Sequence, residues 1–343
     1  MPWPDPRPLR LLVIRNRYIG DTILAVPALR SLRVAFPQAR IDVLVEPGSG
    51  DVLGPCPLKD ELIYWQPRHR GGGAVRPGTL VGLLAPARFL RARHYDRCYI
   101  LRRSFSSALL ALLARIPHRI GFSTEGRGFL LTRSTPYPTD KHEVECFLDI
   151  LRADGVPIVD TGNEGWSDAA SDELVRQNLP AAGRRRVFLG AKSSNSFKEW
   201  RPERFASIAD WLIRERGCEI HVCDAPGNIA YYQSIRDRLS PERRAHWHDW
   251  SSRLNLRSTL SLLRCMQLHV GVDTGLTHMS AAFLVPIVVL IEAAMIVRWR
   301  PWTARHELVI GTLQPRGSSF DRIQVADVQA AINRLLPGEI PHP

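Results

Sequence analysis

Residues 9–35 read LRLLVIRNRYIGDTILAVPALRSLRVA. The segment begins with a short apolar run over residues 9–14 that ends at Arg15. Apolar residues then recur at helical spacing from Ile23 to Ala35. A buried strand, a polar loop and a helix beginning near Thr22 are therefore predicted. This succession is the repeating unit of doubly wound α/β folds.

The same alternation returns along the rest of the chain. Further strands are predicted over residues 41–45, 62–65, 97–101, 186–190 and 219–223, and further helices over 107–114, 202–216 and 229–239. The pattern predicts two Rossmann-like domains with parallel sheets, residues 1–165 and 185–343, facing each other across a cleft where ligands bind. A linker region is expected over 166–184. The sequence does not decide on which of the two domains the last helix, near 325–336, packs.

The formal net charge is +12, and the excess lies near the amino terminus. Residues 1–150 hold 22 Lys and Arg against 13 Asp and Glu. This charge suits an anionic partner or an acidic surface, but arginines that only solvate the protein would give the same count. A nucleic-acid partner is disfavoured, because no known DNA- or RNA-binding signature accompanies the basic residues.

Three features bear on the compartment. The six cysteines lack the spacing of a zinc site, which predicts reduced thiols in a cytoplasmic protein. Prolines interrupt the first residues where a secretory signal needs a continuous apolar stretch. The apolar segment from Met279 to Val297 contains Pro286, which predicts a short helix and a buried strand in place of a membrane span.

Three loops that follow predicted strands carry candidate chemistry. In the first, Gly20 permits a close backbone approach, and Asp21 is placed at the cap or first turn of a helix. Capping alone would explain an aspartate at that position. The loop lacks the GxGxxG pattern, which disfavours a dinucleotide-dependent dehydrogenase.

The second loop, residues 271–278, reads GVDTGLTH and leads into a small-residue helix. The amides of its Thr-Gly-Leu turn, together with the helix amino terminus, form a cradle able to hold a diphosphate. His278 lies in the first turn, where a lone histidine is more often packed than ligand-binding. The third loop, residues 191–200, reads AKSSNSFKEW and offers hydroxyl and ammonium groups to phosphate oxygens, although lysines and serines are common on surfaces.

Several of these motifs resemble glycosyltransferase family 9, the lipopolysaccharide heptosyltransferases. The resemblance runs in order from about residue 9 to 335. It rests on Ile19-Gly20-Asp21 with Pro27-Ala28-Leu29-Arg30, on KEWRPERF over residues 198–205, on DTGLTHM over 273–279, and on Arg119-Ile120-Gly121-Phe122. The Asp-Thr-Gly-x-x-His element is the most specific of them.

The resemblance implies a B-type glycosyltransferase fold and an inverting, metal-independent transfer. The acceptor would bind mainly to the amino-terminal half and ADP-heptose to the carboxyl-terminal half. The acceptor would be a Kdo or heptose hydroxyl of the anionic lipid A inner core, reached peripherally at the inner face of the inner membrane. No cofactor and no metal are expected, and the partners are the nucleotide sugar and the lipid acceptor, with no nucleic acid.

Residue roles follow from the same resemblance. Asp21 would act as the general base, with Asp273 holding sugar hydroxyls and Lys198 neutralising the leaving diphosphate. The predicted donor-binding residues are Ser193, Ser194, Asn228, Thr274, Gly275, Leu276 and His278. The predicted acceptor-binding residues are Arg15, Arg17, Gly20 and Arg119.

Two departures from the family pattern leave the substrates open. Arg17 and Tyr18 replace small hydroxyl residues, and the loop from Asp224 to Asn228 lacks the glutamate that commonly binds the ribose. One alternative is a family member with another nucleotide sugar or an acceptor other than lipid A. A second is a binding protein without turnover. The sequence identifies neither the acceptor hydroxyl nor the oligomeric state.

Overall fold

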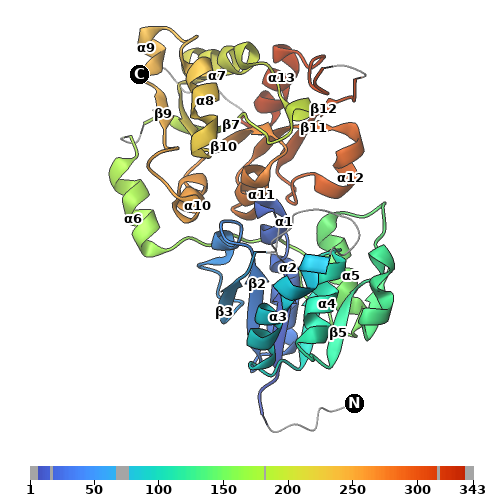
Figure 1. Ribbon diagram of the computed structural model, residues 1–343. Helices are drawn as coiled ribbons and strands as arrows, with labels where there is room; N and C mark the ends of the chain where they lie inside the picture. Colours follow the sequence, from blue (N-terminus) through green and yellow to red (C-terminus); the bar gives the residue numbers. More distant parts are fainter. Residues whose placement is uncertain (1–6, 16–17, 67–76, 181–182, 315–316, 337–343) are drawn as a thin grey trace. The chain divides into compact units, whose positions relative to one another are not determined.

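A computed structural model describes residues 7–15, 18–66, 77–180, 183–314 and 317–336. The chain divides into two compact units, Met1–Gly162 and Asn163–Pro343. Each unit is built on one parallel six-stranded sheet with helices around it (Figure 1). This architecture confirms the predicted fold class. Residue 17, a predicted acceptor contact, and the arginines at positions 68, 70 and 76 lie outside the described residues.

The sheet of the amino-terminal unit has the order β3-β2-β1-β4-β5-β6. Its strands are β1 (Arg10–Ile14), β2 (Arg40–Val45), β3 (Glu61–Tyr64), β4 (Arg97–Ile100), β5 (His118–Phe122) and β6 (Arg133–Thr135). Its helices are α1 (Ile19–Ile23), α2 (Val26–Ala35), α3 (Pro77–Arg91), α4 (Phe105–Leu113) and α5 (Glu143–Ala153), with short 3₁₀ segments η1 (Gly50–Leu53) and η2 (Thr124–Leu130). Strand β1 lies between β2 and β4, which explains why its residues from Leu11 to Ile14 are fully buried.

The helix predicted from Ile23 to Ala35 is wrong at its start. The chain forms a first helix, α1, already at Ile19, and a second helix, α2, from Val26. Pro27 occupies the beginning of α2, where its missing N–H leaves no intrahelical hydrogen bond unmade. Asp21 therefore lies inside the first turn of α1 and not before it.

The carboxyl-terminal sheet has the order β12-β11-β10-β7-β8-β9. Its strands are β7 (Arg185–Gly190), β8 (Cys218–Val222), β9 (Trp247–Asp249), β10 (Leu268–Val272), β11 (Ile287–Glu292) and β12 (His306–Gly311). Its helices are α6 (Ala169–Asn178), α7 (Pro202–Arg216), α8 (Ile229–Arg236), α9 (Pro241–Arg244), α10 (Leu256–Arg264), α11 (Gly275–Ala282), α12 (Ile296–Trp299) and α13 (Val325–Leu335). Counted along the chain within each unit, both sheets have the strand order 3-2-1-4-5-6.

Two segments of this unit bear on the predicted organisation. The range 166–184, predicted as a linker, contains helix α6, which packs against α10. The last helix, α13, packs on β11, β12 and α7 of its own unit (Figure 1). Among the helices in the described ranges, none is both long and apolar enough to cross a bilayer.

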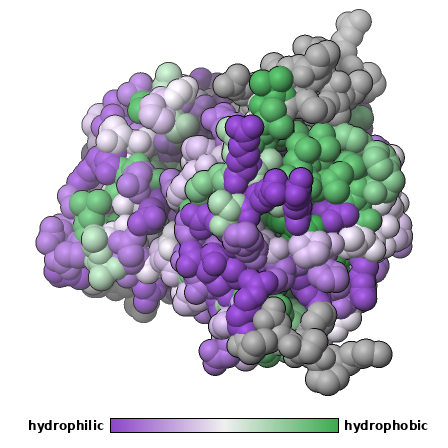
Figure 2. All heavy atoms as spheres, turned by 60° about the horizontal axis from the view of Figure 1, so that its bottom comes forward, coloured by the Kyte–Doolittle hydropathy of each residue, from purple (hydrophilic) through white to green (hydrophobic). Residues whose placement is uncertain are grey.

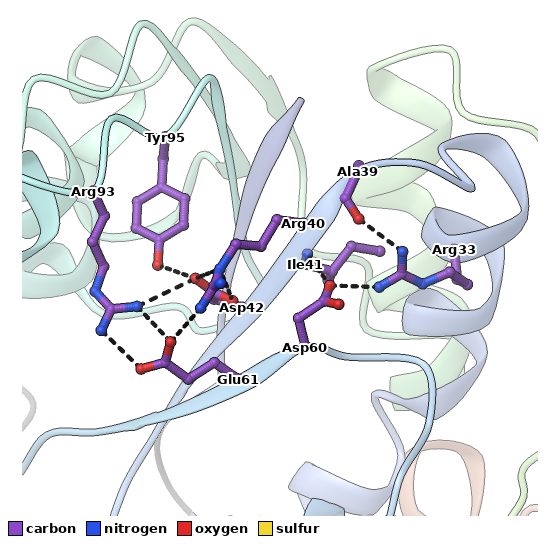
Figure 3. Close-up of polar contacts among 9 residues, drawn as sticks. All are labelled: Arg33, Ala39, Arg40, Ile41, Asp42, Asp60, Glu61, Arg93 and Tyr95. Atoms are coloured by element: carbon purple, nitrogen blue, oxygen red, sulfur yellow. Dashed lines mark hydrogen bonds and ion pairs between the residues drawn. The ribbon is translucent and has the colours of Figure 1, made fainter. Parts of the chain in front are cut away.

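Charged residues hold the amino ends of β2 and β3 to the segment after α3 (Figure 3). Arg93 donates to both carboxylate oxygens of Glu61, at 2.7 and 2.8 Å, and this hydrogen bonding lowers the pKa of Glu61. The hydroxyl of Tyr95 donates to the buried Asp42 at 2.7 Å. Arg40 forms ion pairs with Asp42 and with Glu61. The carboxyl-terminal end of α3 is therefore fixed to the edge of the sheet.

Candidate active site

In open α/β sheets, ligands bind beyond the carboxyl ends of the strands, at the point where the strand order reverses. In the carboxyl-terminal unit this point lies between β7 and β10, which pair in parallel. Parallel neighbours place the loops that follow them at the same edge of the sheet. The loop after β7 carries Lys198 and the loop after β10 carries Asp273, both singled out from the sequence.

Lys198 and Asp273 form an ion pair that joins these two loops. The Lys198 Nζ lies 2.7 Å from Asp273 Oδ2. The aspartate side chain is 6% exposed and the lysine side chain 12% exposed. His278 also approaches the carboxylate, with its Nε2 3.6 Å from Asp273 Oδ1. The structure therefore brings three of the predicted residues together at one edge of the sheet.

Helix α11 begins directly after Asp273, with Thr274 as its cap residue. The hydroxyl of Thr277 donates to the carbonyl of Val272 at 2.9 Å and accepts the amide of Thr274 at 3.4 Å. The Thr274 amide is thus engaged within the loop. The first N–H groups of a helix lack an intrahelical acceptor, so the amides of Gly275 and Leu276 are the candidates for the predicted cradle.

Two glycines allow β7 and β10 to approach at their carboxyl ends. Gly190 pairs with Gly271, and a Cβ on Gly271 would lie only 2.3 Å from the carbonyl oxygen of Gly190. A Cβ on Gly190 would lie 2.8 Å from Nε2 of the buried His269. Larger residues would separate the strands and, with them, the loops that carry Lys198 and Asp273.

The hydroxyl of Tyr232, on α8, also fixes the loop after β7. The Tyr232 hydroxyl accepts the amides of Ala191 at 3.0 Å and Lys192 at 3.3 Å, and donates to Asp224 at 3.0 Å. Burial raises the pKa of this tyrosine well above its ordinary value. A neutral hydroxyl that both donates and accepts therefore connects the loops after β7 and β8.

The remaining predicted donor residues lie in these same loops. Ser193 is buried, and its hydroxyl accepts the amide of Asn195 at 3.2 Å, whereas Ser194 is exposed. Asn228 donates to Asp224 at 2.9 Å. Both carboxylate oxygens of Asp224 accept hydrogen bonds within the unit, which leaves Asn228 as the candidate for a ribose contact.

In the amino-terminal unit the strand order reverses between β1 and β4. Asp21 follows β1, and its carboxylate pairs with Nη2 of Arg15, whose Nε donates to the Asp21 carbonyl at 3.2 Å. The Arg15 side chain is 4% exposed and lies 5.2 Å from the centre of the Phe147 ring. Asp21 is the more accessible partner, with 14% of its side chain exposed. Gly20 is buried in the same turn.

Arg119 is not brought to this edge. It lies near the amino end of β5, and its guanidinium donates to the carbonyls of Leu130 at 2.7 Å and Ile116 at 2.6 Å. These bonds hold the loops at the opposite end of the strand. In this unit the Arg119 guanidinium therefore connects the polypeptide backbone, and the predicted acceptor contact stays a prediction.

A buried arginine that is absent from the predicted site lies at the carboxyl edge of the amino-terminal sheet. Arg127 is fully buried and donates to the carbonyls of Phe122 and Ser104, each at 2.7 Å. Burial lowers its pKa to about 10. It joins the loops after β5 and β4. In the sequence it is one of many arginines in the amino-terminal half, and nothing near it distinguishes it from the others.

His246 and His248 lie at an edge of the carboxyl-terminal sheet. His248 lies on β9 and His246 immediately precedes it. Both rings hydrogen-bond Glu219, at 3.1 Å from His246 and 2.6 Å from His248. In the described part of the chain, no group of three or more His, Cys, Asp or Glu side chains is arranged to hold a metal ion.

Comparisons with known proteins identify the family of the chain. The model of glycosyltransferase family 9 (heptosyltransferase) matches residues 83–325. The chain is 27% identical over 297 residues to lipopolysaccharide heptosyltransferase 2 of Salmonella typhimurium, covering 82% of each protein.

Solved structures share the fold. An E. coli ADP-heptose lipopolysaccharide heptosyltransferase II aligns with a TM-score of 0.82 at 23% identity, over 96% of this chain and 98% of that one. An E. coli heptosyltransferase solved with ADP aligns with a TM-score of 0.75 at 18% identity, over 95% and 99% of the two chains. The chain is a glycosyltransferase and belongs to family 9, the heptosyltransferases.

Proposed function

We propose that the protein transfers heptose from ADP-heptose to a Kdo or heptose hydroxyl of the lipopolysaccharide inner core, with inversion and without a metal ion. The ion pair between Lys198 and Asp273 carries this proposal. It places a cation and a carboxylate beside the first amides of α11, at the edge of the sheet where open α/β folds bind ligands. The E. coli relative named for ADP-heptose and the one solved with ADP support the choice of donor.

The donor diphosphate is held by the Lys198 ammonium, the amides of Gly275 and Leu276, and the exposed Ser194 hydroxyl. These groups neutralise the charge that grows on the diphosphate oxygen as its bond to the anomeric carbon breaks. Asp273 accepts hydrogen bonds from sugar hydroxyls, and His278 lies beside it. Asn228 contacts the ribose.

Asp21 provides the base. The acceptor hydroxyl donates its proton to the Asp21 carboxylate while its oxygen forms the new bond to the anomeric carbon, and ADP leaves from the opposite face. One displacement inverts the configuration. Arg15 fixes the position of the carboxylate through two contacts, one to the side chain and one to the backbone. It is therefore a positioning residue in this proposal.

The acceptor is anionic and lipid-linked, which fits the arginine excess of the amino-terminal half. The protein would act at the cytoplasmic face of the inner membrane as a peripheral protein. A transferase that uses another nucleotide sugar, or an acceptor other than lipid A, is the alternative that the altered Asp224–Asn228 loop favours.

Product analysis tests the proposal. The full chain is mixed with Kdo-lipid A and with ADP-heptose, UDP-sugars or GDP-sugars in parallel, and the products are separated and weighed by mass spectrometry. We expect one heptose to be added from ADP-heptose only, with the anomeric configuration inverted. Transfer from a uridine or guanosine donor alone would contradict the donor assignment, and retained configuration would contradict the single displacement. An unchanged rate in excess chelator is the expected result for metal independence.

A further inference from the structure

Helix α3 carries apolar side chains on two sides. The side toward the sheet holds the buried residues Leu83, Ala87 and Leu90. The opposite side holds Val81, Leu84 and Phe89, which are 68%, 43% and 48% exposed. A helix in a globular unit needs only one apolar side to pack on its own sheet. The second side is therefore available for a contact outside the unit.

The exposed apolar residues continue onto neighbouring elements. Helix α3 packs against α4, and α4 packs against η2. Leu112 of α4 is 38% exposed and Phe129 of η2 is 76% exposed. With Tyr64 of the edge strand β3, we call these six residues the apolar surface: Tyr64, Val81, Leu84, Phe89, Leu112 and Phe129. In Figure 2, apolar side chains gather in one broad area with hydrophilic residues along its lower side.

A hollow of about 390 Å³ opens between β3 and α3 at this surface. Its lining is mainly apolar and includes Leu62, Trp65, Pro86 and Phe89. The polar contacts of Arg93 with Glu61 fix the segment after α3 to the edge of the sheet, so the hollow has a firm wall (Figure 3). Large exposed apolar areas on folded proteins mark sites of protein or membrane contact.

The charge around the apolar surface selects between these partners. Helices α3 and α4 with the residues directly after them, 77–95 and 105–116, contain four arginines and no acidic residue. Arg88, Arg91 and Arg115 are exposed, and no carboxylate of the described residues forms an ion pair with them. Arginine stems can lie along an apolar layer while the guanidinium groups reach the phosphates above it. Two copies of this surface would repel each other through their charges.

We propose that this apolar surface is the membrane-binding face of the protein, with α3 lying in the interface of a bilayer rich in anionic phospholipid. An interfacial helix of this kind combines buried apolar side chains with basic residues that attract anionic headgroups. The inference deepens the proposed function, because a lipid-linked acceptor requires the enzyme to work at a bilayer. It assigns the contact to described residues of α3, α4, β3 and η2.

Vesicle sedimentation with the full chain tests the assignment. The vesicles contain phosphatidylethanolamine with about one-third phosphatidylglycerol, or phosphatidylcholine alone. We expect binding to the anionic vesicles, weakened by salt, and at least tenfold weaker binding to phosphatidylcholine. No binding to the anionic vesicles would overturn the proposal.

A pair of matched variants tests the residues. Leu84→Glu places a charge on the exposed side of α3, and Leu174→Glu makes the same change at a leucine of equal exposure on α6, 43% against 41%. We expect Leu84→Glu to weaken vesicle binding at least about tenfold, since a carboxylate replaces a leucine that the bilayer would otherwise bury. Leu174→Glu should bind as the unmodified chain does. Equal binding by the two variants would overturn the assignment to α3.

A second pair of matched variants tests the contribution of the basic residues. Arg88→Gln removes a guanidinium from the proposed face, and Arg322→Gln removes one from an exposed position in the other unit. We expect about a fivefold loss of vesicle binding for Arg88→Gln, the effect of one basic residue near an anionic surface. Arg322→Gln should have no effect. Equal losses in both would show attraction by net charge alone and would overturn the assignment.

Two further measurements separate this inference from its alternatives and from the proposed function. Sedimentation velocity of the unmodified chain and Leu84→Glu is expected to show the same oligomeric state, and a dimer lost in the variant would make the surface a contact between copies. Transfer to a deacylated, water-soluble acceptor should be unchanged in Leu84→Glu. Absence of transfer in both chains, with vesicle binding intact, would defeat the proposed function and leave the membrane-binding face standing.

Discussion

The two sheets have the same strand order, yet the chain is built differently at the equivalent point of each. In the amino-terminal sheet, Ile14 pairs with Ile100 where β1 and β4 end. In the carboxyl-terminal sheet, the corresponding pair is Gly190 with Gly271. The first unit fills this place with apolar side chains, whereas the second brings two backbones together beside the loops that carry Lys198 and Asp273.

The ion pairs that follow these strands are oriented in opposite ways. Arg15 and Asp21 leave the carboxylate more exposed, at 14% against 4% for the arginine. Lys198 and Asp273 leave the ammonium more exposed, at 12% against 6% for the aspartate. One unit therefore presents a proton acceptor and the other presents a cation. The difference suits a base in the first unit and a diphosphate in the second.

The largest effect is expected from removing the presented carboxylate. Asp21→Asn should lower kcat by about 10² to 10⁴, because the amide cannot accept the proton of the acceptor hydroxyl, while the affinity for ADP stays unchanged. The measurements are steady-state kinetics and calorimetric titration with ADP. Asp149→Asn is the control, since Asp149 is also paired with an arginine and has a 15% exposed side chain. Unaltered kcat in Asp21→Asn would refute its role as the base.

The presented cation is the counterpart. Lys198→Met keeps the length of the side chain and removes its charge, so we expect about 10² to 10³ less kcat/KM and weaker ADP binding. Lys141→Met is the matched control, because Lys141 also lies 2.7 Å from an aspartate, Asp149. If Lys198→Met bound ADP as tightly as the unmodified chain, the assignment of the diphosphate to this edge would be wrong.

The contrast between the isoleucine and glycine pairs predicts a stability effect. Gly271→Ala should destabilise the protein by about 1 to 3 kcal/mol, because the added methyl group meets the backbone of Gly190. At Gly227 a Cβ would meet no atom within 4 Å, so Gly227→Ala should be close to neutral. Urea denaturation measures both. Equal midpoints would show that the strands tolerate a wider separation.

A smaller effect separates the units by their response to acid. Burial lowers the pKa of His221 and of His269 to about 3, and both lie in the carboxyl-terminal unit. An unfolded histidine titrates near 6.5, so the unfolded state binds more protons below that pH. The stability that the two neutral histidines contribute is therefore present above about pH 6.5. It is lost progressively as the pH falls from there toward 3.

Lowering the pH from 7.5 to 6.0 should lower the free energy of unfolding by about 1 to 2 kcal/mol for the two histidines together. In the amino-terminal unit, Arg93 lowers the pKa of Glu61. That contribution is present above the ordinary carboxyl pKa and is lost only at lower pH, so it does not change in this window. Seven of the nine tryptophans lie in residues 163–343, so urea unfolding followed by fluorescence reports the histidine-containing unit. An unchanged midpoint at pH 6.0 would contradict the prediction.

Much of the fold is predictable because periodicity and turn chemistry agree locally. Helix α7 has the predicted bounds, and the strands predicted over 41–45 and 186–190 are β2 and β7 to within one residue. The prediction was wrong where one local residue or a very short element departed from the apolar periodicity of the longer segment around it. Pro27 starts a new helix within a continuous apolar period, and β9 is three residues long and carries polar side chains.

The candidate site was predictable in its loops but not in its pairings. Asp21, Lys198 and Asp273 stand out because each follows an apolar strand. Their partners depend on which strands become neighbours, and strand order is not visible in a single sequence. For the same reason Arg119 resembles a ligand contact in the sequence, whereas in the fold it binds carbonyls at the other end of its strand.

The hydroxyl of Tyr232 has a consequence for the thermodynamics of donor binding. By accepting two successive amides of the loop after β7, it orders that backbone in the ligand-free protein. Rigidity acquired on folding reduces the conformational entropy lost when a ligand arrives. Replacing this tyrosine by phenylalanine would shift that loss to the binding step, so nucleotide association would become less favourable in entropy and more sensitive to temperature.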